Sequence, residues 1–174
     1  MKKLFTLVVV ALMAVATVNA KPYKFAIGAI TGMEWGASMK MNVMDNFTIM
    51  DDLSYDIVIS RPSGYQGFFN HLNLAYQDQA ASGDGIDLGW YVGGGVSIGY
   101  VDPQGFGADG GKFGINAIAG IEANMKSAPI AFTLDFRPGY ACLFGKGFGD
   151  GINVGTSHTF DWALTLGVRY TLPN

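Results

Sequence analysis

The sequence has one cysteine, Cys142, and few charged residues. A chain with a single cysteine forms no internal disulfide, so other interactions must hold its fold together. Charged residues make up 14% of the chain, whereas about a quarter is usual for a soluble globular domain. Hydrophobic residues account for 49%, and glycine for 25 of the 174 residues. No run after residue 20 approaches the roughly 20 apolar residues of a membrane-spanning helix. High apolarity without such a helix favours strands.

The first 20 residues have the three parts of a secretory signal peptide. Lys2 and Lys3 form a basic start, an apolar run extends over residues 4–15, and Val18 and Ala20 occupy the small-residue positions before a cleavage site. The pattern predicts a signal peptide over residues 1–20 and one mature domain over residues 21–174. The residue after the predicted cut is not cysteine, so we expect no lipoprotein-type lipid attachment.

The predicted mature chain is acidic. Removal of Lys2 and Lys3 leaves 9 of the 11 basic residues against 14 acidic ones, a formal charge of −5. This balance argues against nucleic acid as a partner. No Cys/His spacing indicates a zinc site, and we expect no cofactor.

Apolar residues alternate with polar or small ones along most of the mature chain. Residues 87–101 are the clearest case: Leu88, Trp90 and Val92 stand in one register, and Gly89 and Gly93 in the other. Similar alternation predicts about eight strands, at residues 24–32, 34–41, 55–59, 68–77, 87–101, 112–125, 130–137 and 160–172. Prolines cannot donate to a sheet ladder. All six fall at the ends of these segments or between them, namely Pro22, Pro62, Pro103, Pro129, Pro138 and Pro173.

The two registers indicate which face meets which surroundings. A soluble barrel turns its large apolar residues inward and its charges outward. Here the second register is too small and too sparsely charged for a solvated exterior, whereas an outer-membrane barrel turns apolar residues to lipid and polar ones to its lumen. An even number of antiparallel strands can also close on itself and remove its edges. The predicted fold is therefore all-β, an antiparallel up-and-down transmembrane β-barrel of about eight strands.

Aromatic residues gather near the two ends of the predicted strands. With the amino terminus in the periplasm, one rim would hold Phe25, Tyr55, Trp90 and Tyr170. The other rim would hold Trp35, Tyr100, Phe113, Phe160 and Trp162. Two aromatic belts are typical of membrane interfaces.

Ionisable residues gather in the predicted lumen register, where a narrow barrel is filled by side chains. They are Glu34, Lys40, Asp56, His71, Glu122, Asp135, Arg137, Asp161 and Arg169. We interpret them as a structural network that plugs the lumen, because charges in a low-dielectric interior must be paired. A gated ion path or a catalytic carboxylate pair is the functional alternative.

Several of these segments together resemble a known family. Residues 72–77, 89–100, 113–125, 128–140 and 161–172 are similar in order and pattern to the small outer-membrane β-barrel proteins of Gram-negative bacteria, of the OmpX and OmpA-barrel type. The resemblance implies a monomer in the outer membrane, in contact with membrane lipid and lipopolysaccharide. It also implies that the barrel assembly machinery reads the terminal strand, in which Tyr170 fits and Leu172 stands where the family has phenylalanine.

Function is less determined than location. The first hypothesis is a structural or adhesive surface protein, with residues 142–158 as its candidate surface loop; within it we single out Cys142, Lys146, Phe148, Asp150 and His158. The second is a lipid-modifying enzyme such as an acyltransferase or lipase, using Ser157, His158 and Asp161. Adjacent Ser and His on a strand point to opposite faces, so we expect no enzyme activity. The third is a soluble exported lipocalin-like binding barrel.

Overall fold

A computed structural model of the chain describes residues 23–56, 66–102, 110–146 and 154–172. The predicted signal peptide lies outside these ranges. Within them, all regular secondary structure is β-strand. None of the described residues belongs to a helix long and apolar enough to cross a membrane.

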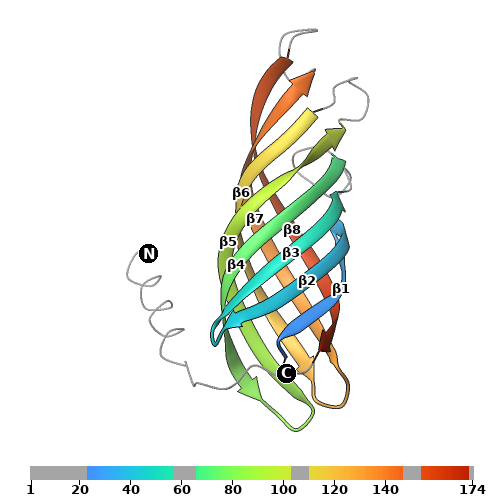
Figure 1. The fold of residues 1–174 in the computed structure, drawn as a ribbon, viewed down its shortest axis with the longest axis vertical. Helices are drawn as coiled ribbons and strands as arrows, with labels where there is room; N and C mark the ends of the chain where they lie inside the picture. The colour runs from blue at the N-terminus through green and yellow to red at the C-terminus, as the bar shows by residue number, and fades with distance from the viewer. Residues whose placement is uncertain (1–22, 57–65, 103–109, 147–153, 173–174) are drawn as a thin grey trace, which may run out of the picture.

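Eight antiparallel strands form one closed ring (Figure 1). The strands are β1 (Phe25–Gly32), β2 (Glu34–Met44), β3 (Phe47–Asp56), β4 (Gln66–Ser82), β5 (Ile86–Asp102), β6 (Gly110–Met125), β7 (Ile130–Lys146) and β8 (Val154–Leu172). Each strand pairs with the next, and β8 returns to pair with β1 from Phe25↔Leu172 to Gly32↔Thr165. The predicted all-β, up-and-down arrangement of about eight strands is confirmed. Closure gives every strand a neighbour on both sides, although the part of β8 before Leu164 extends beyond its pairing with β1.

The ring is taller on one side than on the other. Strands β4 to β8 contain 16 to 19 residues, whereas β1 to β3 contain 8 to 11. In Figure 1 the long strands rise at the top of the picture, while both the start of β1 and the end of β8 lie at the bottom. Met33 alone links β1 to β2, and Gly32 before it has a φ of 122°, which glycine adopts without strain.

Side chains alternate between an inner and an outer face, as successive residues of a strand must. In β8 the odd-numbered residues from 161 to 169 are buried, and the even-numbered residues from 162 to 170 are exposed. The buried set contains Asp161, Thr165 and Arg169, whereas the exposed set contains Leu164 and Leu166. The polar register therefore lines the interior and the apolar register forms the exterior.

Glycine makes room for the largest inner side chains. A Cβ atom at Gly120 would lie 2.5 Å from Cζ of Tyr91 and 2.6 Å from Oδ1 of Asp135. Both neighbours are fully buried, so neither has space to move aside. Gly120 on β6 thus allows the Tyr91 ring on β5 to cross the interior.

Several predicted strand boundaries are wrong: β4 extends to Ser82 and β8 begins at Val154, and the third and seventh strands differ most. The third strand is not residues 55–59: β3 covers Phe47–Asp56, and residues 57–59 lie outside the described part. The seventh strand does not stop at Pro138, because β7 continues to Lys146 and Pro138 pairs with Trp162 of β8. On the other side of β7, the pairing with β6 skips Pro138 and its neighbour between Asn116↔Gly139 and Ala119↔Phe136. Proline is tolerated there because the ladder is interrupted on that side alone.

We expect Gly120→Val to destabilise the barrel by about 1–3 kcal/mol, the usual cost of overpacking. The matched control is Ala119→Val, which adds the same side chain one residue away on the exposed outer face. Urea unfolding followed by tryptophan fluorescence compares the two variants. Equal stability of the two would contradict the packing described here.

Candidate functional site

The interior of the barrel holds all nine ionisable residues of the predicted lumen register. Each is buried: Glu34, Lys40, Asp56, His71, Glu122, Asp135, Arg137, Asp161 and Arg169. They come from β2, β3, β4, β6, β7 and β8, so their side chains converge from most of the ring. Their contacts divide them into two groups.

Arg137 is the centre of the first group, the Arg137 cluster. Its Nη1 donates to Oε2 of Glu34 at 2.9 Å, its Nη2 donates to Oδ2 of Asp52, and Nη2 lies 3.7 Å from Oδ2 of Asp135. Glu34 and Asp52 belong to β2 and β3, whereas Arg137 belongs to β7. One guanidinium group therefore ties together strands that are not neighbours in the ring.

Arg169 extends this cluster from β8. Its Nε donates to Oγ of Ser38 at 2.8 Å and its Nη1 to Oγ1 of Thr133 at 3.2 Å. Its Nη2 lies 3.9 Å from Oδ1 of Asp52 and 4.0 Å from Oδ2 of Asp135. The two arginines thus share the same two aspartates, and their opposite charges allow burial.

Glu122 is the centre of the second group, the Glu122 cluster. Its Oε2 lies 2.5 Å from Nζ of Lys40, and its Oε1 accepts from the side-chain amides of Gln77 and Asn124, both at 3.0 Å. The hydroxyl of Tyr23 donates to the same carboxylate, at 2.8 Å from Oε2 and 2.9 Å from Oε1. Burial, and then the Glu122 charge, raise the pKa of this phenol well above its usual value, so it remains a donor. Tyr23 precedes β1, and its buried ring adds to the filling of the interior.

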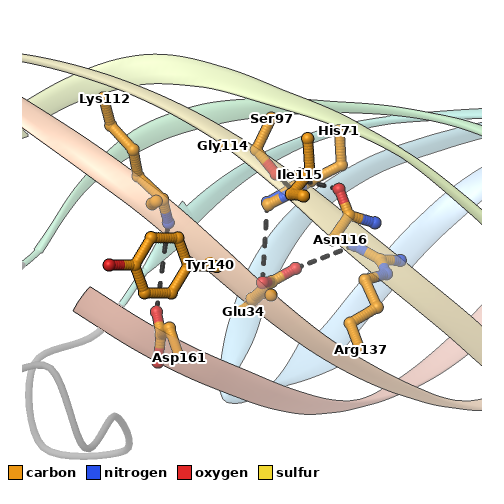
Figure 2. A pocket seen from close by; sticks show the side chains of 12 residues that line it. Glu34, His71, Ser97, Lys112, Gly114, Ile115, Asn116, Arg137, Tyr140 and Asp161 are labelled. Atoms are coloured by element: carbon orange, nitrogen blue, oxygen red, sulfur yellow. Dashed lines mark hydrogen bonds and ion pairs between the residues drawn. The ribbon is translucent and has the colours of Figure 1, made fainter. Parts of the chain in front are cut away.

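Figure 2 shows a small cavity beside the Arg137 cluster, of about 20 Å³. Glu34, His71, Lys112 and Asp161 line it, and Oε1 of Glu34 lies 3.5 Å from Nε2 of His71. Lys112 reaches Asp161 at 3.9 Å and stands 4.0 Å from the centre of the Phe69 ring. A space of this size holds about one water molecule.

The Arg137 cluster has more acidic than basic groups. Five carboxylates belong to it, those of Glu34, Asp52, Asp56, Asp135 and Asp161, against three basic side chains, those of Lys112, Arg137 and Arg169. Over these eight described side chains the formal charges sum to −2.

The three residues considered for catalysis do not meet. His158 is exposed on the outer face, where its ring stacks on Tyr140 with centroids 6.0 Å apart and an interplanar angle of 9°. Asp161 is buried inside beside Lys112, and Ser157, next to His158, points to the opposite face from it. The arrangement therefore offers no Ser-His-Asp relay.

The predicted surface loop is shorter than residues 142–158. Cys142 and His158 pair with each other in β7 and β8, and Lys146 is the last residue of β7. Phe148 and Asp150 lie outside the described residues. The prediction was wrong at these ends because Pro138 and the glycines that follow it were read as the end of a strand.

The predicted aromatic belts lie on the outer face, with one residue at the wrong rim. The outward register carries Phe25, Trp35, Tyr55, Trp90, Tyr100, Phe113, Phe160, Trp162 and Tyr170. Tyr55 stands at the end of β3, paired with Trp35 and with its ring centroid 4.8 Å from that of Phe68. It therefore lies at the rim opposite to the predicted one. Since β8 begins at Val154, Phe160 and Trp162 lie within the strand and not at its start.

Asp52 is the main interior residue that the sequence did not reveal. It lay outside the predicted strands because β3 breaks the alternation: Met50 points inward and Asp51 outward. The segment from Asp45 to Asp52 therefore lacks the regular alternation by which the other strands were predicted. Polar residues at every second position, Asp52, Ser54 and Asp56, all point inward, and this spacing could have predicted the strand.

Comparison with known proteins does not assign the chain to a family. No family model, no curated protein and no solved structure matches it.

Arg137→Met is expected to lower the free energy of unfolding by about 3–5 kcal/mol, because it leaves the Glu34 and Asp52 carboxylates buried without their cation. The control is Lys126→Met at the end of the barrel. There Nζ lies 3.1 Å from Asp87 but the lysine side chain is 41% exposed, so we expect a loss below about 1 kcal/mol. Urea denaturation of the refolded variants measures both. Similar losses would refute a structural role for the Arg137 cluster.

Proposed function

We propose that this chain is an integral β-barrel protein of the Gram-negative outer membrane. Its role is structural or that of a surface-interaction protein, and paired polar side chains fill its lumen. The observation that carries the proposal is the inverted distribution of side chains: large apolar groups cover the outside of the ring and ionised groups occupy the inside.

The outer face is too apolar to be favourable in water. Among its side chains, Phe68 and Phe160 are 62% exposed, Ile115 is 63% exposed and Leu166 is 55% exposed. Exposed apolar side chains occur on all eight strands. Soluble monomers rarely expose continuous apolar patches above a few hundred Å², and each Å² left in water costs roughly 25 cal/mol. Contact with hydrocarbon removes this cost.

A soluble lipocalin-like barrel would have the opposite distribution. Such a barrel packs apolar side chains inside and presents charge to water. Here the described interior has two small apolar clusters, one of Met50, Ala75, Tyr91 and Ile118 and one of Phe69, Val101 and Leu143, and a few other buried apolar residues. The third sequence hypothesis therefore has little structural support.

Aromatic pairs on the outer face support placement in a membrane. One row joins Trp35, Tyr55, Phe68 and Tyr100 as register partners across β2 to β5. Further down the same strands, Tyr76 lies 5.7 Å between ring centroids from both Phe47 and Trp90. Two such groups at different heights fit the two interfaces of a bilayer.

One polar pair interrupts the apolar exterior. Asp51 in the middle of β3 and Asn70 on β4 both point outward, and Nδ2 of Asn70 donates to Oδ1 of Asp51 at 2.5 Å. The hydrogen bond satisfies part of the carboxylate, which reduces the cost of placing it in lipid. In the proposed membrane this pair is less costly than an unpaired carboxylate, but it still costs free energy relative to apolar residues.

The candidate contact region is the connection between β7 and β8. These two strands belong to the tall side of the ring, at the top of Figure 1, and residues 147–153 between them lie outside the described part. Connections held by a rigid scaffold are common sites of recognition. In the proposed orientation this end faces the lipopolysaccharide surface.

Expression of the full chain in a Gram-negative host tests the location. We expect the protein in the outer-membrane fraction, extracted only by detergent, with a folded gel band that shifts in mobility after boiling. Folded protein that stays soluble without detergent would contradict the proposal.

Replacing the outward pair Asp51 and Asn70 tests whether the outer face contacts lipid. Asp51→Leu combined with Asn70→Leu should keep or raise the urea midpoint of the protein in lipid vesicles, because it removes a carboxylate from hydrocarbon. The neighbouring Asp52→Leu points inward and removes a partner of Arg137, so it should cost about 3–5 kcal/mol. A double variant that is destabilised as much as Asp52→Leu would count against a lipid-facing exterior.

A further inference from the structure

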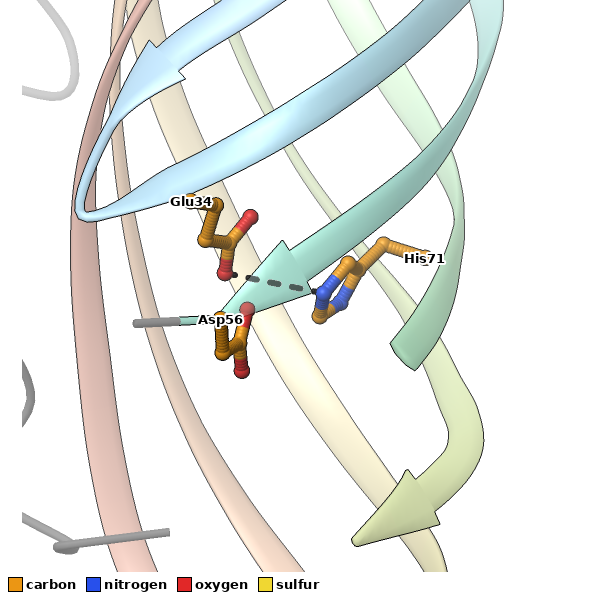
Figure 3. Close-up of side chains that lie close together, drawn as sticks. All are labelled: Glu34, Asp56 and His71. Atoms are coloured by element: carbon orange, nitrogen blue, oxygen red, sulfur yellow. Dashed lines mark ion pairs between the residues drawn. The ribbon is translucent and has the colours of Figure 1, made fainter. Parts of the chain in front are cut away.

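Three buried side chains from neighbouring strands converge inside the barrel. Glu34 starts β2, Asp56 ends β3, and His71 lies on β4. Glu34 and Asp56 are register partners, and His71 is inward on the adjoining strand. Each offers one ligand atom, and these atoms all lie within 4.8 Å of one another. Figure 3 shows the two carboxylates and the imidazole facing the same point.

From this geometry we infer that Glu34, Asp56 and His71 bind a divalent transition-metal ion such as Zn²⁺. The inference goes beyond the proposed function and does not depend on where the barrel resides.

A chain of hydrogen bonds determines the tautomer of the His71 side chain. The hydroxyl of Ser97 donates to Oδ1 of Asn116 at 2.9 Å, and Nδ2 of Asn116 donates in turn to Oδ1 of Asn73. The Ser97 oxygen therefore accepts from Nδ1 of His71, 3.0 Å away. A neutral His71 then carries its proton on Nδ1 and turns the lone pair of Nε2 toward the other two residues.

That orientation is the one a metal ligand requires. Ligating histidines usually donate their second ring N–H to a fixed acceptor, which holds the tautomer and the ring. Here Nε2 lies 3.5 Å from Oε1 of Glu34. A lone pair and a carboxylate oxygen repel each other unless a cation or a proton lies between them.

The surroundings of the three ligands are acidic. Among the described residues, the Arg137 cluster has five carboxylates and three basic groups. Arg137 holds Oε2 of Glu34 at 2.9 Å and so leaves Oε1 directed toward His71.

The space and the ligand types indicate the class of ion. The cavity of about 20 Å³ borders both Glu34 and His71, so one water molecule can complete the coordination shell. One imidazole and two carboxylates suit Zn²⁺ and related transition metals, whereas Mg²⁺ and Ca²⁺ prefer oxygen ligands alone.

Calorimetric titration of the purified, EDTA-treated full barrel with ZnCl₂ tests the site directly. We expect saturable binding of one ion per chain and a higher thermal midpoint with Zn²⁺ than with Mg²⁺. Absence of saturable binding to the folded wild-type protein would overturn the inference, and would mean that a proton on His71 satisfies the cluster.

The two histidines of the chain provide matched variants. His71→Gln and Asp56→Asn should each weaken Zn²⁺ binding by at least about 100-fold, and Ser97→Ala by about 10-fold or more through the orientation of the ring. His158→Gln changes the exposed outer histidine and should bind as the wild type does. Loss of binding in His158→Gln with retention in His71→Gln would overturn the assignment. If His71→Gln does not fold, the Co²⁺-loaded wild type decides the question. Visible d–d bands much stronger than those of aqueous Co²⁺ would indicate a four- or five-coordinate site in the protein, whereas the weak spectrum of aqueous Co²⁺ would overturn the inference.

Discussion

The pairing of buried charges is the constraint on which this barrel depends. Because side chains along a strand alternate between two faces, a ring with an apolar exterior must carry its polar residues inside. Ionised groups are stable there only with opposite charges and donors around them. Arg137 meets this condition by reaching from β7 to Glu34 on β2 and to Asp52 on β3. The backbone ladder closes the ring, and these contacts join its walls across the interior.

The interior of this barrel is mostly polar and its exterior is apolar, the reverse of the usual distribution in a soluble globular protein. The chain has one cysteine and therefore no internal disulfide, and the apolar clusters of the described interior are small. Its stability comes from the closed ladder and from compensated charge. In the proposed membrane, transfer of the exterior out of water would add a third contribution. A bound cation would strengthen the second one.

Alternation along the sequence was sufficient to predict the strands in which it is regular. In β6 apart from the inward Ile118, and in β8 from Phe160 onward, bulky apolar residues and small or polar residues lie on opposite faces, so both strands and the inward direction of Glu122 and Arg169 follow from the pattern. In β3 the inward Met50 and the outward Asp51 reverse it, and the strand and its central residue Asp52 were missed. Pro138 ended a predicted strand that in fact continues, because a proline disturbs the ladder on one side only. The convergence of Glu34, Asp56 and His71 depends on strand register, which spacing along the chain does not contain.

The orientation of the two faces can be measured most directly with the tryptophans. The three in the chain, Trp35, Trp90 and Trp162, all belong to the outward register. Their fluorescence can be recorded in vesicles that contain brominated lipid and, separately, in the presence of the aqueous quencher acrylamide. If hydrocarbon surrounds the barrel, brominated lipid quenches the emission strongly and acrylamide quenches it weakly. Strong quenching by acrylamide with none by brominated lipid, in a folded protein, would contradict the account.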